Sequence, residues 1–190
     1  MGKKLKLLRI TFLLGLKEYR GNTMKLEPGQ VLVMEGIHCL NDELTYLIPK
    51  NQKYKIYISC LTVLNIDYHN RIPTTDSRLL RRMVRDKQFR GYSADVTLKL
   101  WPSVNRGEAK NIFPFQEEAD AMFNSSLVYE IGVLKKHAVP LLREISREHP
   151  RFSETQRMLL MLRYFEDIPD ECVPDNSLLK EFIGGSIFEH

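Results

Sequence analysis

Apolar residues recur along the chain with two different spacings, which predict strands and helices respectively. Strand-like apolar runs occur at 5–13, 17–26, 31–34, 54–61 and 120–123. Apolar residues at helical spacing occur at 76–90, 93–101, 135–147 and 153–166. Pro140 is expected near the start of its helix, because proline is tolerated best there. Residues 127–134 fit a strand or a helix equally well.

The order of these elements predicts an α/β fold with a mostly parallel sheet and flanking helices, because strands alternate with helices after residue 30. The first two runs predict an N-terminal β-hairpin over 4–26 that turns at Gly15. The 190 residues suffice for one core and contain no linker or repeat, so we expect a single domain over 1–190. Prolines and a Gly-Gly pair predict an irregular tail at 167–190.

The run Val31-Leu32-Val33-Met34 is apolar throughout, which is typical of a strand covered on both faces of a sheet. Glu35 follows it, and open α/β folds bind ligands at the carboxyl edge of the sheet. Glu35 is therefore a candidate magnesium ligand, directly or through water. The alternative is that Glu35 only caps the next turn. His38 is interpreted as a polar residue of the core.

Positive charge is concentrated in one segment of a chain whose net charge is only +4. Residues 71–90 hold seven Arg or Lys residues against two Asp residues. At about 100° per residue, four arginines share an arc of roughly 100° on one helix face, opposite an apolar face: Arg78, Arg81, Arg82 and Arg85. Asp86 is the one acid near them in sequence, so the cluster favours an anion such as phosphate over a plain solvated face. Gly91 is expected to end the helix in a left-handed conformation.

Other features narrow the function classes. The three cysteines lack CxxC spacing, which speaks against zinc and for a reducing compartment. No apolar run has the 18 residues of a membrane span, so the chain is interpreted as cytoplasmic, with no membrane partner. Trp101 and Phe113 could stack on a base, but packing of the 93–101 helix is the favoured interpretation. The sequence contains no GxxxxGK[ST], GxGxxG, GxSxG or HExxH motif.

Together these segments resemble the uridine kinase and phosphoribulokinase family of P-loop kinases, in its bacterial uridine kinase-like branch. Residues 31–38 resemble the family's Walker-B-like strand and turn, and 76–91 resemble its arginine-rich lid helix. The segments 101–104 and 111–120 are similar to that branch, as is the tail Phe182-Ile183-Gly184-Gly185-Ser186. The resemblance covers residues 17–190, with the lid region at 76–101.

The resemblance implies an ATP- and Mg²⁺-dependent phosphotransferase that acts on a nucleoside or related hydroxyl. Glu35 would be the acid near magnesium, and Phe12 would contact the substrate. The lid arginines that contact phosphates would be Arg82, Arg85 and Arg90, beside Arg78 and Arg81 of the same helix. The family's P-loop and general-base Asp lie upstream of the matching region, so an incomplete P-loop fold without turnover by this chain alone is expected.

Two further expectations remain open at this point. The alternative function is a non-catalytic nucleotide- or RNA-binding module that uses the same arginine helix. The 31–34 strand is expected to leave an unpaired sheet edge, through which the chain would self-associate.

Overall fold

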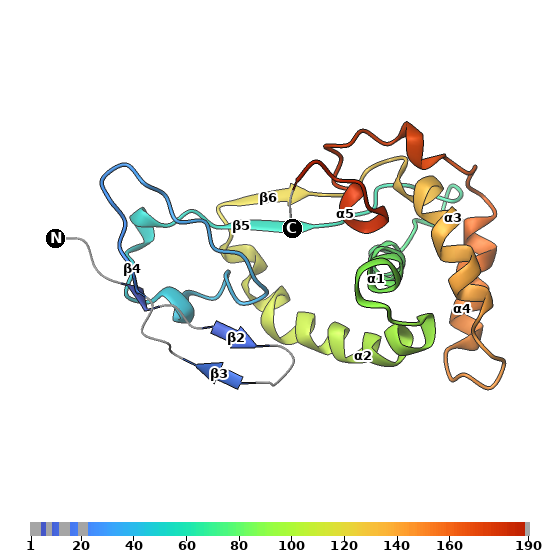
Figure 1. Cartoon of the computed structure of the whole chain (residues 1–190), viewed down its shortest axis with the longest axis horizontal. Coiled ribbons are helices and arrows are strands. Elements are labelled where there is room, and N and C mark those ends of the chain that lie inside the picture. The colour runs from blue at the N-terminus through green and yellow to red at the C-terminus, as the bar shows by residue number, and fades with distance from the viewer. Residues whose placement is uncertain (1–4, 7–8, 12–15, 19–22, 189–190) are drawn as a thin grey trace. The chain divides into compact units, whose positions relative to one another are not determined.

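The computed structural model describes residues 5–6, 9–11, 16–18 and 23–188 (Figure 1). The chain forms two compact units, Met1–Cys39 and Leu40–His190. The expected single domain over 1–190 stays a prediction. Phe12, the candidate substrate contact, lies outside the described residues.

The strands of the first unit pair in two short antiparallel ladders. β1 (Leu5–Lys6) pairs with β4 (Thr23–Met24), and β2 (Arg9–Thr11) pairs with β3 (Leu16–Glu18). The predicted turn at Gly15 lies outside the described residues, so the complete hairpin stays a prediction.

The apolar run at 31–34 does not form the predicted buried strand. It has no regular secondary structure, and Val31 and Val33 are both 85% exposed. An all-apolar strand is stable when neighbouring strands and helices cover it, and among the described residues no strand pairs with this run. The prediction was wrong because an apolar pattern indicates only a tendency to be buried. It does not show which strands or helices will cover the run. His38, predicted to lie in the core, is also exposed.

The sheet of the second unit is a parallel pair. β5 (Ile56–Ser59) follows two short 3-10 helices, η1 (Asp42–Thr45) and η2 (Lys50–Gln52). β6 (Ala121–Asn124) pairs with β5 in parallel, with Ile56 opposite Ala121 and Ser59 opposite Asn124. A parallel connection needs a crossover of a dozen or more residues, which the helices between the two strands provide. The prediction of an α/β fold is confirmed to this extent.

The crossover helices are α1 (Thr74–Arg90) and α2 (Ala94–Asn111). α1 ends as predicted, because Gly91 adopts a φ of 66° and its N–H bonds to the carbonyl of Asp86. α2 continues well past the predicted end, with Pro102 inside it. The short 3-10 helix η3 (Phe113–Glu118) then leads to β6.

The remaining helices follow β6 along the chain. They are α3 (Glu130–Arg143), α4 (Phe152–Leu162), the 3-10 helix η4 (Asp170–Cys172) and α5 (Lys180–Ile183). α3 starts earlier than predicted and holds Pro140 near its end. Buried apolar residues on both sides of Pro140, including Ala138 and Leu141, offset the hydrogen bond that the proline removes.

The core of the second unit surrounds α1. α1 packs against α2, α3 and α5 (Figure 1). Its apolar face is buried as predicted: Leu79, Leu80, Met83 and Val84. The tail also reaches this core, because Leu179 and Phe182 are buried in it. Among the described residues, the helices are too short or too polar to cross a membrane.

Candidate functional site

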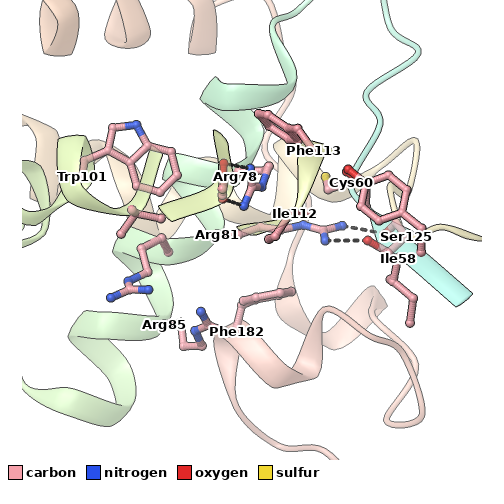
Figure 2. A pocket seen from close by; sticks show the side chains of 15 residues that line it. Ile58, Cys60, Arg78, Arg81, Arg85, Trp101, Ile112, Phe113, Ser125 and Phe182 are labelled. Atoms are coloured by element: carbon pink, nitrogen blue, oxygen red, sulfur yellow. Dashed lines mark hydrogen bonds and ion pairs between the residues drawn. The ribbon is translucent and has the colours of Figure 1, made fainter. Parts of the chain in front are cut away.

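Four arginines of α1 line one cavity of about 230 Å³, here called the arginine cavity (Figure 2). They are Arg78, Arg81, Arg82 and Arg85. Ser59, Cys60 and Ser125 also line it. Because these three lie at the carboxyl ends of the parallel strands β5 and β6, the cavity occupies the edge of the sheet where α/β folds bind ligands.

The helical spacing of the arginines brings them together on one face of α1 as predicted, and neighbouring helices cover most of that face. The Arg81 side chain is only 9% exposed, and the other three are between 24% and 31% exposed. Helices α2, α3 and α5 each bring an acid against this face. The arginine face of α1 is therefore partly neutralised by acids from three other helices.

Arg81 is held in the most extensive network. Its Nε lies 3.1 Å from Glu130 Oε1, and its Nη2 lies 2.5 Å from Glu130 Oε2. Arg81 also donates to Ser125, at 3.1 Å from the hydroxyl and 2.6 Å from the carbonyl oxygen. Glu130 in turn accepts the N–H of Leu127 at 2.8 Å, at the start of α3. Breaking such a buried pair leaves an uncompensated charge, so we assign Arg81 a mainly structural role.

Arg78 is paired just as firmly. It donates to Glu108 of α2, whose side chain is 7% exposed. Burial lowers the pKa of the Arg78 guanidinium from its ordinary value, but arginine remains protonated in proteins. This pair ties α1 to α2 at the wall of the arginine cavity.

Arg82 and Arg90 share a single carboxylate. Arg82 Nε lies 2.7 Å from Asp86 Oδ2, and Arg90 Nη1 lies 2.7 Å from Asp86 Oδ1. Asp86 is fully buried and also accepts the hydroxyl of Thr97 at 3.2 Å. Two guanidinium groups on one carboxylate leave positive charge in excess at this end of α1. Arg90 is not among the residues that line the arginine cavity.

Arg85 is the least firmly held of the four. Its Nη1 lies 3.4 Å from Glu181 Oε1 of α5. Its Nε is buried and has no hydrogen-bond acceptor within the described residues. The ring of Phe182 lies over both Arg81 and Arg85, with its centroid 5.1 and 5.8 Å from their Cζ atoms (Figure 2). Arg85 therefore keeps donor capacity for a ligand.

Sequence reasoning missed the acids and the ring that complete this site. Glu108 lies seven residues, about two helical turns, after the buried Trp101, so the two residues share one face of the helix. A single acid on this apolar face was the signal in the sequence that could have indicated a buried ion pair. Glu130 and Glu181 come from distant segments, and no local pattern in the sequence connects them to α1. The expected stacking residues also line the cavity: Trp101 is 3% exposed and packs α2, as favoured, while Phe113 is 46% exposed.

The predicted magnesium ligand receives no support from neighbouring acids. Glu35 is exposed in the first unit. Burial, and then the negative charge of Glu35, raise the pKa of the Cys39 thiol. Within the described part of the chain, no three His, Cys, Asp or Glu side chains gather as a metal site would require. Because Mg²⁺ also binds through one or two carboxylates and substrate phosphates, a magnesium site at Glu35 stays a prediction.

Comparison with known proteins identifies the family of the chain. The model of the phosphoribulokinase / uridine kinase family matches residues 11–131, which include all of α1 and α2. The chain therefore belongs to the phosphoribulokinase / uridine kinase family. No curated protein and no solved structure matched the chain. Helix α5, with Glu181 and Phe182, lies outside the matched residues.

Proposed function

We propose that this chain provides the phosphate-binding arginine site of a uridine kinase-like, ATP-dependent phosphotransferase that acts on a nucleoside or related hydroxyl. One observation carries the proposal: four arginines of one helix line a single cavity at the carboxyl ends of parallel strands, in a member of this kinase family. Guanidinium groups match the oxygens of a phosphate in charge and geometry.

The charge balance supports an anionic ligand. The arginines of α1 outnumber their acidic partners, five to four, in the described ion pairs: Arg78, Arg81, Arg82, Arg85 and Arg90 against Asp86, Glu108, Glu130 and Glu181. The acids neutralise most of this positive charge. The remaining positive charge and the loosely held Arg85 would stabilise a bound phosphate. We assign contact with the ligand to Arg82 and Arg85, and a structural role to Arg78 and Arg81.

The proposal assigns binding and orientation of a phosphate to this chain, and no turnover to the chain by itself. The 190 residues contain no GxxxxGK[ST] sequence, whose amides and lysine would hold the β- and γ-phosphates. ATP and Mg²⁺ would belong to the complete reaction, in the cytoplasm. Contact of Glu35 with magnesium and contact of Phe12 with substrate are part of this proposal.

Titration with ATP and with pyrophosphate by calorimetry tests the proposal. We expect a dissociation constant between millimolar and high micromolar, because partly neutralised arginines realise only some of the roughly 1.5–3 kcal/mol of each charge-assisted hydrogen bond. Arg85→Ala should weaken binding several-fold without unfolding the chain, since its partner Glu181 is partly solvated. Combined Arg82→Ala and Arg85→Ala should weaken it by about tenfold or more.

The matched control is Arg143→Ala with Arg147→Ala, which removes the same charge from exposed positions outside the cavity. Equal binding by the wild type and the Arg82/Arg85 variant would contradict the proposal. A single-stranded RNA oligomer in the same titration tests the alternative function. Binding of RNA far tighter than ATP, with a steep dependence on salt, would favour the RNA-binding module instead.

A further inference from the structure

The tail brings the carboxylate of Glu181 against Arg85, which lines the arginine cavity, and places the ring of Phe182 in the cavity wall. Helix α5 is anchored there by its own apolar residues, because Phe182 is 6% exposed and Leu179 before it is fully buried. Glu181, between these two positions, points its carboxylate to Arg85 and remains 39% exposed. The helix is therefore fixed in the core while the Glu181 side chain reaches solvent.

Glu181 differs from the other acids around α1 in both contact and burial. The side chains of Glu108, Glu130 and Asp86 are between 0% and 7% exposed, and each contacts its arginine closely. Glu181 contacts Arg85 through one long approach of 3.4 Å. A solvated carboxylate loses little when it returns to water, whereas a buried one would be left uncompensated. Glu181 is thus the acid that a ligand displaces at the lowest cost.

Phe182 keeps Arg85 in place whichever anion it contacts. The ring lies within 6 Å of two guanidinium groups, the range in which a cation interacts with an aromatic face. Hydrogen bonds to Glu130 and Ser125 fix the position of Arg81. The Phe182 ring packs against this fixed guanidinium group and also supports that of Arg85 (Figure 2). Exchange of Glu181 for a ligand therefore requires rotation of one side chain and no movement of α5.

We propose that Glu181 is an exchangeable counter-ion of Arg85: it pairs with this arginine in the free protein and gives way to a phosphate or pyrophosphate group when the ligand binds. The inference rests on the proposed function, because it concerns the same cavity. It makes the tail a regulator of phosphate affinity, with Glu181 as a built-in competitor and Phe182 as the support that orients Arg85.

Pyrophosphate titration by calorimetry of the full chain and its variants tests this inference. Glu181→Gln should tighten binding about two- to fivefold, the range expected when a partly exposed ion pair no longer competes. Glu171→Gln is the control, because it removes the same charge from an exposed position of the same tail that takes no part in the described ion pairs of the α1 arginines. Phe182→Leu should weaken binding while α5 stays anchored by an apolar residue.

A double-mutant cycle separates exchange at Arg85 from a general effect of charge. In the Arg85→Ala background, Glu181→Gln should no longer tighten binding. If it tightens binding equally in both backgrounds, or if it behaves as Glu171→Gln does, the exchange is refuted while the proposed function stands. If neither the wild type nor any variant binds pyrophosphate or ATP, the proposed function fails and the inference fails with it.

Discussion

Cys60 illustrates how the chemistry of a single residue depends on its neighbours at the arginine cavity. Its thiol is buried and donates to Glu130 Oε1 at 3.4 Å. Burial, and then the negative charge of Glu130, raise the pKa of the Cys60 thiol to about 11. A protonated thiol is a poor nucleophile. Cys60 therefore contributes packing and a weak hydrogen bond, and no covalent chemistry.

This environment predicts selective alkylation of the native chain. At pH 8 roughly one Cys60 thiol in a thousand is ionised, so iodoacetamide should modify it very slowly. Cys172 is exposed and should be modified first. Peptide mass spectrometry over time measures both rates, and unfolding in guanidinium should make Cys60 reactive. Equal rates for Cys60 and Cys172 in the native chain would contradict the burial of Cys60.

The residues that sequence reasoning found and missed differ in one physical respect. The cluster from Arg78 to Arg85 follows from helical spacing within one segment, and the structure brings these arginines to one cavity. Their partners Glu108, Glu130 and Glu181 depend on how separate helices pack, which a pattern within one helix does not contain. The roles expected of Glu35 and Phe12 rest on the family resemblance alone and stay predictions.

Among the elements, the sequence predicted most reliably those that have a strong pattern and a clear end. α1 has four apolar residues on one face and Gly91 at its end, and the observed helix begins only two residues before the predicted 76–90 range. The prediction ended α2 at 101, whereas the helix runs on through Pro102 to Asn111. The prediction placed Pro140 near the start of a 135–147 helix and left 127–134 open, whereas α3 begins at Glu130 and holds Pro140 near its end. Packing of both helices against the core outweighs the cost of these prolines.

The contact between α3 and the chain before η4 gives a sharp test at the scale of elements. A Cβ atom on Gly132 would lie 2.8 Å from the carbonyl oxygen of Glu166 and 2.9 Å from Ile168 Cδ1. The backbone here is also tied, because Ile168 N–H donates to the Gly132 carbonyl at 3.2 Å. Gly132→Ala should therefore lower the free energy of unfolding by about 1–3 kcal/mol, as overpacking does.

The control for this change is Gly107→Ala, in the interior of α2, where a Cβ atom would meet nothing within 4 Å. Alanine there should raise the free energy of unfolding by about 0.5–1 kcal/mol, because it removes the entropy cost of a helical glycine. Urea unfolding followed by circular dichroism measures both. A Gly132→Ala chain as stable as Gly107→Ala would show that α3 does not pack closely against this segment.

At the scale of the whole molecule, the α/β class and the family were accessible from sequence, but the extent of the sheet was not. The predicted strands at 54–61 and 120–123 form a parallel pair, whereas the run at 31–34 stays outside regular structure. Apolar patterning records which residues favour burial and not which neighbours bury them. In the described structure the sheet accordingly has two strands, with both outer edges unpaired.

These open edges predict that the chain associates with itself. Apolar side chains of the pair are exposed beside them: Ile56 is 51%, Ile58 62%, Met122 57% and Phe123 57% exposed. Parallel sheets are normally covered on both faces, and unpaired apolar strands add neighbours from other chains. Light scattering over a concentration series should show a mass that rises above that of one chain.

Ile56→Lys should reduce this association, because a charge on an edge strand opposes further pairing. Val63→Lys, the same kind of change at an exposed position outside the strands, should have little effect. A wild-type chain that stays monomeric throughout the series would show that the edges of β5 and β6 do not recruit a second copy.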